Sequence, residues 1–175
     1  MSLPPTPGQT IGPFFGEALP FAAGPQLVPA SDPGAIRLHG TVRDGAGDGV
    51  PDALVELWQP DATGEISRAS GSLPRGGGFT GWGRAATDAS GRYEFTTLRP
   101  GGAAPCFVLA VFARGLLDRL VTRAYLPDHP ALGEALAWAP ADRRDTLVAR
   151  ADADGYAVDL VLQGDAETVF LTYPE

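Results

Sequence analysis

Hydrophobic and polar residues alternate with a period of two through most of the chain after residue 35, which is typical of β-strands with one buried face. The segments that follow this pattern, or that concentrate β-forming residues, are 36–43, 53–58, 92–96, 106–113, 120–126, 144–151, 156–163 and 168–173. Turn signals separate them, and Ala153-Asp154-Gly155 is the strongest hairpin signal of the chain. About eight strands joined by turns predict an all-β fold, a single antiparallel β-sandwich over residues 36–175.

Three segments depart from this alternation. Residues 106–113 are apolar at every position, so we expect a central strand that is covered on both of its faces. Residues 130–138 form the one plausible short helix, with Pro130 in its first turn. Residues 64–83 show neither period and are expected to form a long loop.

The first 35 residues have no regular period and contain eight prolines, which remove backbone donors and prevent a regular helix. They are nevertheless too apolar for a solvated tail, because they carry Ile11, Phe14, Phe15, Leu19 and Phe21. We therefore expect residues 1–35 to form an extended N-terminal arm that lies against another surface. Periodicity does not decide whether that surface belongs to the same domain or to a partner.

Composition narrows the function classes. The net charge of −8 disfavours a nucleic acid or an anionic membrane as partner, because both attract basic surfaces. The chain has no apolar run of the ~18 residues that a membrane span needs, and its start lacks the features of a signal peptide. One cysteine cannot form an internal disulfide, which fits a cytoplasmic location.

Metal-binding residue types are scarce, with two histidines and one cysteine. His39 lies in a predicted strand and His129 in a loop, and neither has a second ligand at strand or helical spacing. Cys106 lies in the all-apolar segment, where burial as a small hydrophobic residue is the ordinary explanation. These three residues are therefore weak candidates for metal binding or nucleophilic chemistry.

Arg114 is a stronger candidate, because it places a fixed positive charge at the end of the all-apolar segment, directly before Gly115. A guanidinium held there can present paired donors to a carboxylate ligand. The other interpretation is an internal ion pair with one of the 21 acidic residues. The residues alone favour the ion pair and leave the ligand-binding role open.

Several stretches of the sequence resemble the intradiol ring-cleaving dioxygenases. Residues 6–15 (TPGQTIGPFF) and 112–115 (FARG) carry the specific part of the resemblance. The strand-and-turn stretches at 38–42, 55–64 and 83–88 and the tail at 163–170 also match, although similar strands occur in many prealbumin-like domains. The resemblance runs from Thr6 to about Tyr173 and is to the alpha chains of the two-chain members of the family.

The resemblance implies that Fe(III) is held by two tyrosines and two histidines of the beta chain. Here the span Glu65–Gly83 contains no tyrosine, Gly101-Gly102-Ala103-Ala104-Pro105 replaces the second tyrosine, and Cys106-Phe107-Val108 replaces a His-x-His pair. The four tyrosines that are present, Tyr93, Tyr125, Tyr156 and Tyr173, fall within predicted strands. The resemblance therefore implies that a partner beta chain binds the iron and that this chain is inactive without it.

The same resemblance implies that this chain contributes half of a pocket and no catalytic residue. Thr10, Gly12, Pro13 and Arg114 would line the beta chain's active site, and the arm would pack on that partner. Arg114 would lie beside the carboxylate of protocatechuate, which the enzyme would cleave with O2 to 3-carboxy-cis,cis-muconate. Phe14 stands where many relatives have tyrosine, so a hydroxyl contact is not expected there.

Two other functions stay open at this stage. The first is a non-catalytic, prealbumin-like module for binding or scaffolding, although such a module has no need of the N-terminal arm. The second is a self-sufficient enzyme that uses His39, Cys106 or His129. The iron content of the isolated chain distinguishes this second alternative from the alpha-chain interpretation.

Overall fold

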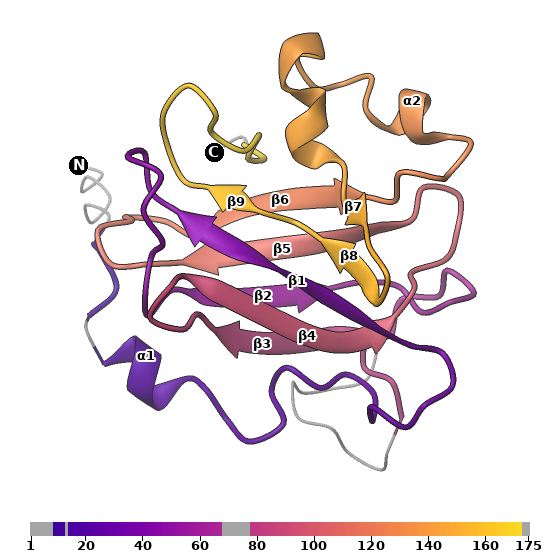
Figure 1. The fold of residues 1–175 in the computed structure, drawn as a ribbon, viewed down its shortest axis with the longest axis horizontal. Coiled ribbons are helices and arrows are strands. Elements are labelled where there is room, and N and C mark those ends of the chain that lie inside the picture. The colour runs from indigo at the N-terminus through magenta and orange to yellow at the C-terminus, as the bar shows by residue number, and fades with distance from the viewer. Residues whose placement is uncertain (1–8, 13, 68–77, 173–175) are drawn as a thin grey trace, which may run out of the picture.

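The computed structural model describes residues 9–12, 14–67 and 78–172. Within these residues, two β-sheets pack face to face as a sandwich, which confirms the predicted fold class (Figure 1). The strands are β1 (Ala35–Arg43), β2 (Leu54–Trp58), β3 (Trp82–Ala86), β4 (Arg92–Leu98), β5 (Cys106–Phe112), β6 (Leu120–Tyr125), β7 (Arg150–Ala151), β8 (Gly155–Ala157) and β9 (Leu160–Val161). The helices are α1 (Phe15–Ala18), α2 (Leu132–Ala135) and the 3-10 helix η1 (Ala141–Leu147). None of the helices described is long and apolar enough to cross a bilayer.

One sheet has the strand order β3-β2-β5-β6 and is antiparallel throughout. Its strand β5 lies between β2 and β6, as the all-apolar segment predicts. The other sheet has the order β4-β1-β8-β7, with β9 beside β1. It is mixed rather than purely antiparallel, because β1 runs parallel to both β8 and β9.

The core fills the space between the two sheets. Side chains that are completely buried come from both layers, and they include Leu38, Val42, Val55, Leu57, Phe95, Phe107, Leu109, Val111 and Leu160. Strand β5 is fully covered only on this inner face, since Val108 and Phe112 on the opposite face are only half-buried. The prediction that both faces of this strand are covered is therefore met by the isolated chain on one face only.

Strand β3 lies at the end of a segment that the sequence predicts as a long loop. Its residues 82–86 have little β-branched character, so local propensity does not mark them as a strand. Tertiary contacts supply what propensity lacks, because the Arg84 guanidinium pairs with Glu56 of β2 at 2.6 Å. The Trp82 ring also packs edge-on against Trp58, with the ring centroids 5.9 Å apart.

The C-terminal part of the chain contains shorter elements than the sequence predicts. Residues 141–147 form η1 rather than the start of a strand, and the Arg144 guanidinium donates to backbone carbonyls of the preceding turn. The predicted strand 156–163 is broken between β8 and β9, where the Asp159 carboxylate accepts a hydrogen bond from the Thr41 N–H at 2.9 Å. Residues 168–172 are not a strand, although the Leu171 N–H donates to the Val121 carbonyl.

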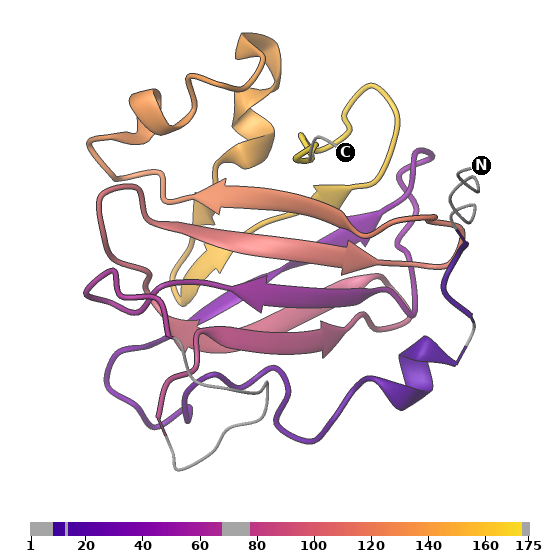
Figure 2. The ribbon, with the colours of Figure 1, turned by 180° about the vertical axis from the view of Figure 1, so that it is seen from behind.

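The N-terminal arm does not lie apart from the sandwich. Figure 2 shows it running along the β3 edge of the four-stranded sheet, where the Phe21 ring stacks on Trp82 with centroids 5.8 Å apart. The Leu27 N–H donates to the Thr96 carbonyl at 2.8 Å, and the Leu27 side chain is buried in the core. The later part of the arm therefore packs on its own domain, and docking of the arm on a partner stays a prediction.

The hairpin predicted at residues 153–155 joins β7 to β8, and its Asp152 forms an ionisable pair with His39 of β1. His39 Nε2 lies 2.6 Å from the Asp152 carboxylate, and this hydrogen bond lowers the pKa of Asp152 below its ordinary value of 3.8. A lowered pKa in the folded state means that the carboxylate stabilises the fold at any pH above 3.8. That contribution is lost as the pH falls through the lowered value.

We therefore expect Asp152→Asn to flatten the dependence of stability on pH below about pH 4. Urea unfolding midpoints measured between pH 2.5 and pH 6 would check this, with Asp165→Asn as control. Asp165 is exposed and makes no side-chain hydrogen bond among the residues described. An acid limb that is equally steep in Asp152→Asn and in the unmodified chain would contradict the expectation.

Candidate functional site

Arg114 is presented by the turn that follows the buried strand β5. The side chain of Ala113 is buried in the core, whereas that of Arg114 is 59% exposed. Gly115 then adopts a positive φ of 91°, which a residue without Cβ tolerates, and the Leu116 N–H closes the turn on the Ala113 carbonyl. The rigid strand thus ends in a fixed turn that holds one guanidinium at the surface.

Arg114 forms the ion pair that the sequence left as one of its two interpretations. Its Nη2 lies 2.9 Å from Oδ2 of Asp52, whose side chain is 43% exposed. A pair this open to water contributes little to stability, typically under ~1 kcal/mol. The contact therefore does not exhaust the role of Arg114, since Asp52 engages only one of its three guanidinium nitrogens and the guanidinium has no other ion pair among the residues described.

The structure brings Thr10 of the arm to the same place. The Gly115 N–H donates to Thr10 Oγ1 at 2.9 Å, across 105 residues of sequence. Gly12 follows two residues along the arm, is exposed, and has no atom within 4 Å of where a Cβ would stand. Pro13 lies outside the residues that the structure describes. Thr10 and Arg114 thus come together at one end of the sandwich, with Gly12 close to Thr10 in the chain.

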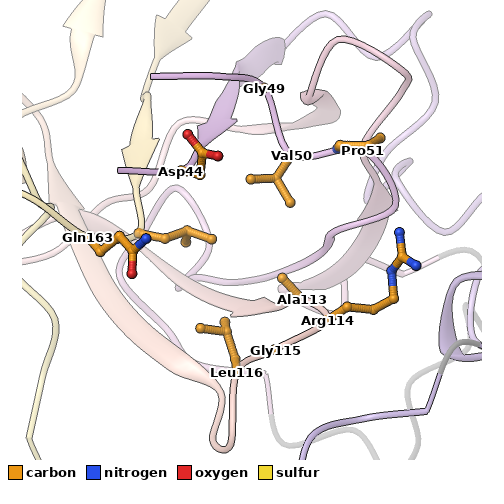
Figure 3. A pocket seen from close by; sticks show the side chains of 10 residues that line it. Asp44, Gly49, Val50, Pro51, Ala113, Arg114, Gly115, Leu116 and Gln163 are labelled. Atoms are coloured by element: carbon orange, nitrogen blue, oxygen red, sulfur yellow. The ribbon is translucent and has the colours of Figure 1, made fainter. Parts of the chain in front are cut away.

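A hollow of about 410 Å³ adjoins this end of the sandwich (Figure 3). Its lining combines apolar Val50 and Leu116 with polar Asp44 and Gln163. Figure 3 shows that the Arg114 guanidinium lies at the rim and points away from the hollow. The hollow is therefore not by itself a pocket around the guanidinium.

Asp52 and Asp44 are the residues at this end that the sequence did not single out. In the sequence, Pro51-Asp52 indicates only a turn before β2, and Asp44-Gly45 only a turn after β1. The sequence indicated that Arg114 could pair with an acidic residue, but it did not indicate which one. Gln163 begins the tail stretch 163–170 that resembles the family, so the sequence did mark that region.

The three weak candidates for independent chemistry are not among the residues that form this site. His39 is paired with Asp152 on the mixed sheet. His129 accepts a hydrogen bond at Nδ1 from the Ala131 N–H at 3.2 Å. Cys106 packs beside a small apolar cluster under η1, and burial raises the pKa of its thiol. Among the residues described, no nucleophile is hydrogen-bonded to His39 or His129 and no base to Cys106.

The donor groups that the structure describes do not fit a ferric iron. Among the residues described, no three histidine, cysteine or acidic side chains converge on one point. The Tyr93 hydroxyl donates to the Val158 carbonyl, and burial followed by the nearby Asp159 charge raises its pKa, which opposes a phenolate. The Tyr156 hydroxyl accepts a hydrogen bond from Nε of Arg99, which directly follows β4 of the same sheet. No step of a reaction is therefore assigned to iron held by this chain.

Comparison with known proteins gives consistent matches. Residues 10–107 match the sequence model of a dioxygenase family. The alpha chain of protocatechuate 3,4-dioxygenase from Burkholderia cepacia is 36% identical over 193 residues, covering 97% of this chain and 98% of its own length. The beta chain of that enzyme from the same organism is 33% identical, over 74% of this chain and 64% of its own.

A solved structure agrees with these sequence matches. The dioxygenase domain of a carbohydrate-binding fusion protein from Streptomyces sp. SirexAA-E superimposes with a TM-score of 0.60 and 25% identity. The superposition covers 92% of this chain and 99% of that domain. The family model spans more than half of the chain, and the alpha-chain relative aligns over nearly all of it. The chain therefore belongs to the intradiol ring-cleaving dioxygenase family, as a homologue of its alpha chains.

Proposed function

We propose that this chain is the alpha subunit of a protocatechuate 3,4-dioxygenase and that it completes the active site of a beta chain. The whole enzyme would insert both atoms of O2 between the two hydroxylated ring carbons, giving 3-carboxy-cis,cis-muconate. The observation that carries the proposal is the hydrogen bond from Gly115 to Thr10, which assembles the arm and Arg114 at one end of the sandwich. Gly12 and Pro13 would complete this half of the pocket.

In this proposal the chemistry of this subunit is binding and orientation. The substrate carries its carboxylate on the side of the ring opposite the two hydroxyls. The Arg114 guanidinium would hold that carboxylate through charge-assisted hydrogen bonds, with the donors that Asp52 leaves free. Fixing this end of the ring places the reacting carbons in a defined position, which is a contribution of orientation rather than of bond-making. Fe(III) is assigned to the beta chain.

The exposed outer face of the four-stranded sheet supports the proposal that a partner chain binds there. A groove of about 370 Å³ on the outer face of the four-stranded sheet is lined mainly by apolar side chains, among them Trp58, Val108 and Phe112, and also by the charged Glu56 and Arg119. Trp58 is 50% exposed there, although aromatic side chains usually bury most of their surface. A beta chain would supply the cover that the outer face of β5 lacks. The free thiol of Cys106 agrees with an assembly in the cytoplasm.

The substrate-binding role of Arg114 is tested by comparing two substrates on the assembled alpha–beta enzyme. We expect Arg114→Ala to raise KM for protocatechuate about 10- to 100-fold, which corresponds to the usual free-energy contribution of a hydrogen bond to a charged group. KM for catechol, which lacks the carboxylate, should change little. Steady-state O2 uptake with both substrates measures the difference.

Arg150→Ala is the matched control, because Arg150 is exposed on β7 and has no ion pair among the residues described. Its two KM values should equal those of the unmodified enzyme. An equal rise of KM for both substrates in Arg114→Ala would assign Arg114 to the structure of the interface instead.

A further inference from the structure

We infer that Asp52 is a positioning residue for substrate binding, because it fixes the Arg114 guanidinium in the orientation that receives the substrate carboxylate. The inference rests on the proposed function of Arg114. The contact that carries it is the 2.9 Å ion pair between Asp52 Oδ2 and Arg114 Nη2. Asp52 lies just before β2 and Arg114 just after the neighbouring strand β5, so this pair joins two turns at one end of the sandwich.

The turn that carries Asp52 is held in place by hydrogen bonds to the buried side chain of Thr87. Asp52 adopts a φ of 57°, in the left-handed region that aspartate enters more readily than most residues. The buried hydroxyl of Thr87 donates to the Val50 carbonyl and accepts from the Ala53 N–H, both at 2.8 Å. These two bonds bracket Asp52, so they hold the backbone on both sides of it in place.

The N-terminal arm lies over the same carboxylate-bearing residue. A Cβ placed on Gly16 of α1 would stand 3.7 Å from the Cβ of Asp52, which is ordinary van der Waals contact. Thr10 meanwhile accepts the Gly115 hydrogen bond beside Arg114. Asp52 therefore lies close to the arm on one side and is paired with the guanidinium on the other.

Positioning by Asp52 has a physical reason. A half-exposed arginine side chain has many accessible rotamers, and ordering it during substrate binding lowers affinity. Asp52 removes part of that disorder beforehand by engaging a single nitrogen, Nη2. The remaining donors of the guanidinium stay available for a bidentate contact with a carboxylate. Asp52 thus selects for carboxylated substrates without contacting them.

The opposite effect would follow if Asp52 competed with the substrate for Arg114. Removing a competing carboxylate would lower KM for protocatechuate, whereas removing a positioning carboxylate raises it. The two roles therefore predict changes of opposite sign, and a kinetic measurement separates them.

The experiment uses the assembled alpha–beta enzyme with two substitutions that suit a positive φ. Asp52→Asn keeps the shape and removes the charge, and Asp52→Gly removes the whole side chain. We expect KM for protocatechuate to rise about three- to fivefold in each, as for loss of one exposed ion pair. KM for catechol and the melting temperature should stay unchanged. Asp48→Asn, an exposed aspartate without a side-chain bond among the residues described, is the control.

A double variant completes the test. In the Arg114→Ala background, Asp52→Asn should have no further effect on KM for protocatechuate, because the group that Asp52 positions is absent. A lowered KM, an equal shift for both substrates, or an undiminished effect without Arg114 would each overturn the inference. If Arg114→Ala is selective for protocatechuate and the Asp52 variants change nothing, only this inference fails. If Arg114→Ala is not selective, the proposed role of Arg114 fails first.

Discussion

Purified without a beta chain, this protein should take up no O2 with protocatechuate and should retain no stoichiometric iron. The physical reason is its donor set, because the described tyrosine and histidine side chains are committed elsewhere in the fold. Tyr93 is buried with its hydroxyl bonded to a carbonyl, and His39 is paired with Asp152. Mixing the chain with its own beta chain should give turnover that neither chain gives alone. Oxygen-electrode assays and metal analysis of each chain and of the mixture measure both quantities.

A control is needed to show that this chain does more in the mixture than stabilise the beta chain. The assembly carrying Arg114→Ala serves this purpose, since it should still turn over catechol while binding protocatechuate weakly. Turnover by this chain alone would contradict the proposed function. A beta chain that gains no activity from its presence would contradict it equally.

The largest expected effect on stability is at Phe107, in the middle of the sandwich. Its side chain is completely buried on the inner face of β5, and its ring lies 5.8 Å from that of Tyr156 on the opposite sheet. Replacing it by alanine leaves a cavity that the two sheets cannot close, so we expect Phe107→Ala to lower the free energy of unfolding by about 3–5 kcal/mol. That loss is a large part of the roughly 5–15 kcal/mol that a domain of this size has.

Phe14→Ala is the matched control, because it deletes the same ring from a position that is 77% exposed. Its unfolding free energy should stay within about 0.5 kcal/mol of the unmodified chain. Urea denaturation of both variants at neutral pH provides the comparison. Equal stability losses in the two variants would show that Phe107 is not part of a packed core.

Most of the strands were predictable because their signals are local. The alternation in residues 36–43 and the turn at residues 153–155 are properties of neighbouring positions, and both are found in the structure. Strand β3 and helix η1 were not predictable from such signals. Each depends on long-range or side-chain contacts, such as Arg84 with Glu56, that outweigh weak local propensity.

The sequence alone determined the fold class, the central place of β5 and the two stretches that carry the family resemblance, since periodicity and motifs are written in consecutive residues. The tertiary structure alone decided which acid pairs with Arg114 and that Thr10 accepts the Gly115 hydrogen bond. It also showed that residues 21–28 of the arm pack on their own sandwich. From the sequence alone, any of the 21 acidic residues could be the partner of Arg114. Only the antiparallel pairing of β2 with β5 within one sheet, which places the turn before β2 beside the turn after β5, selects Asp52.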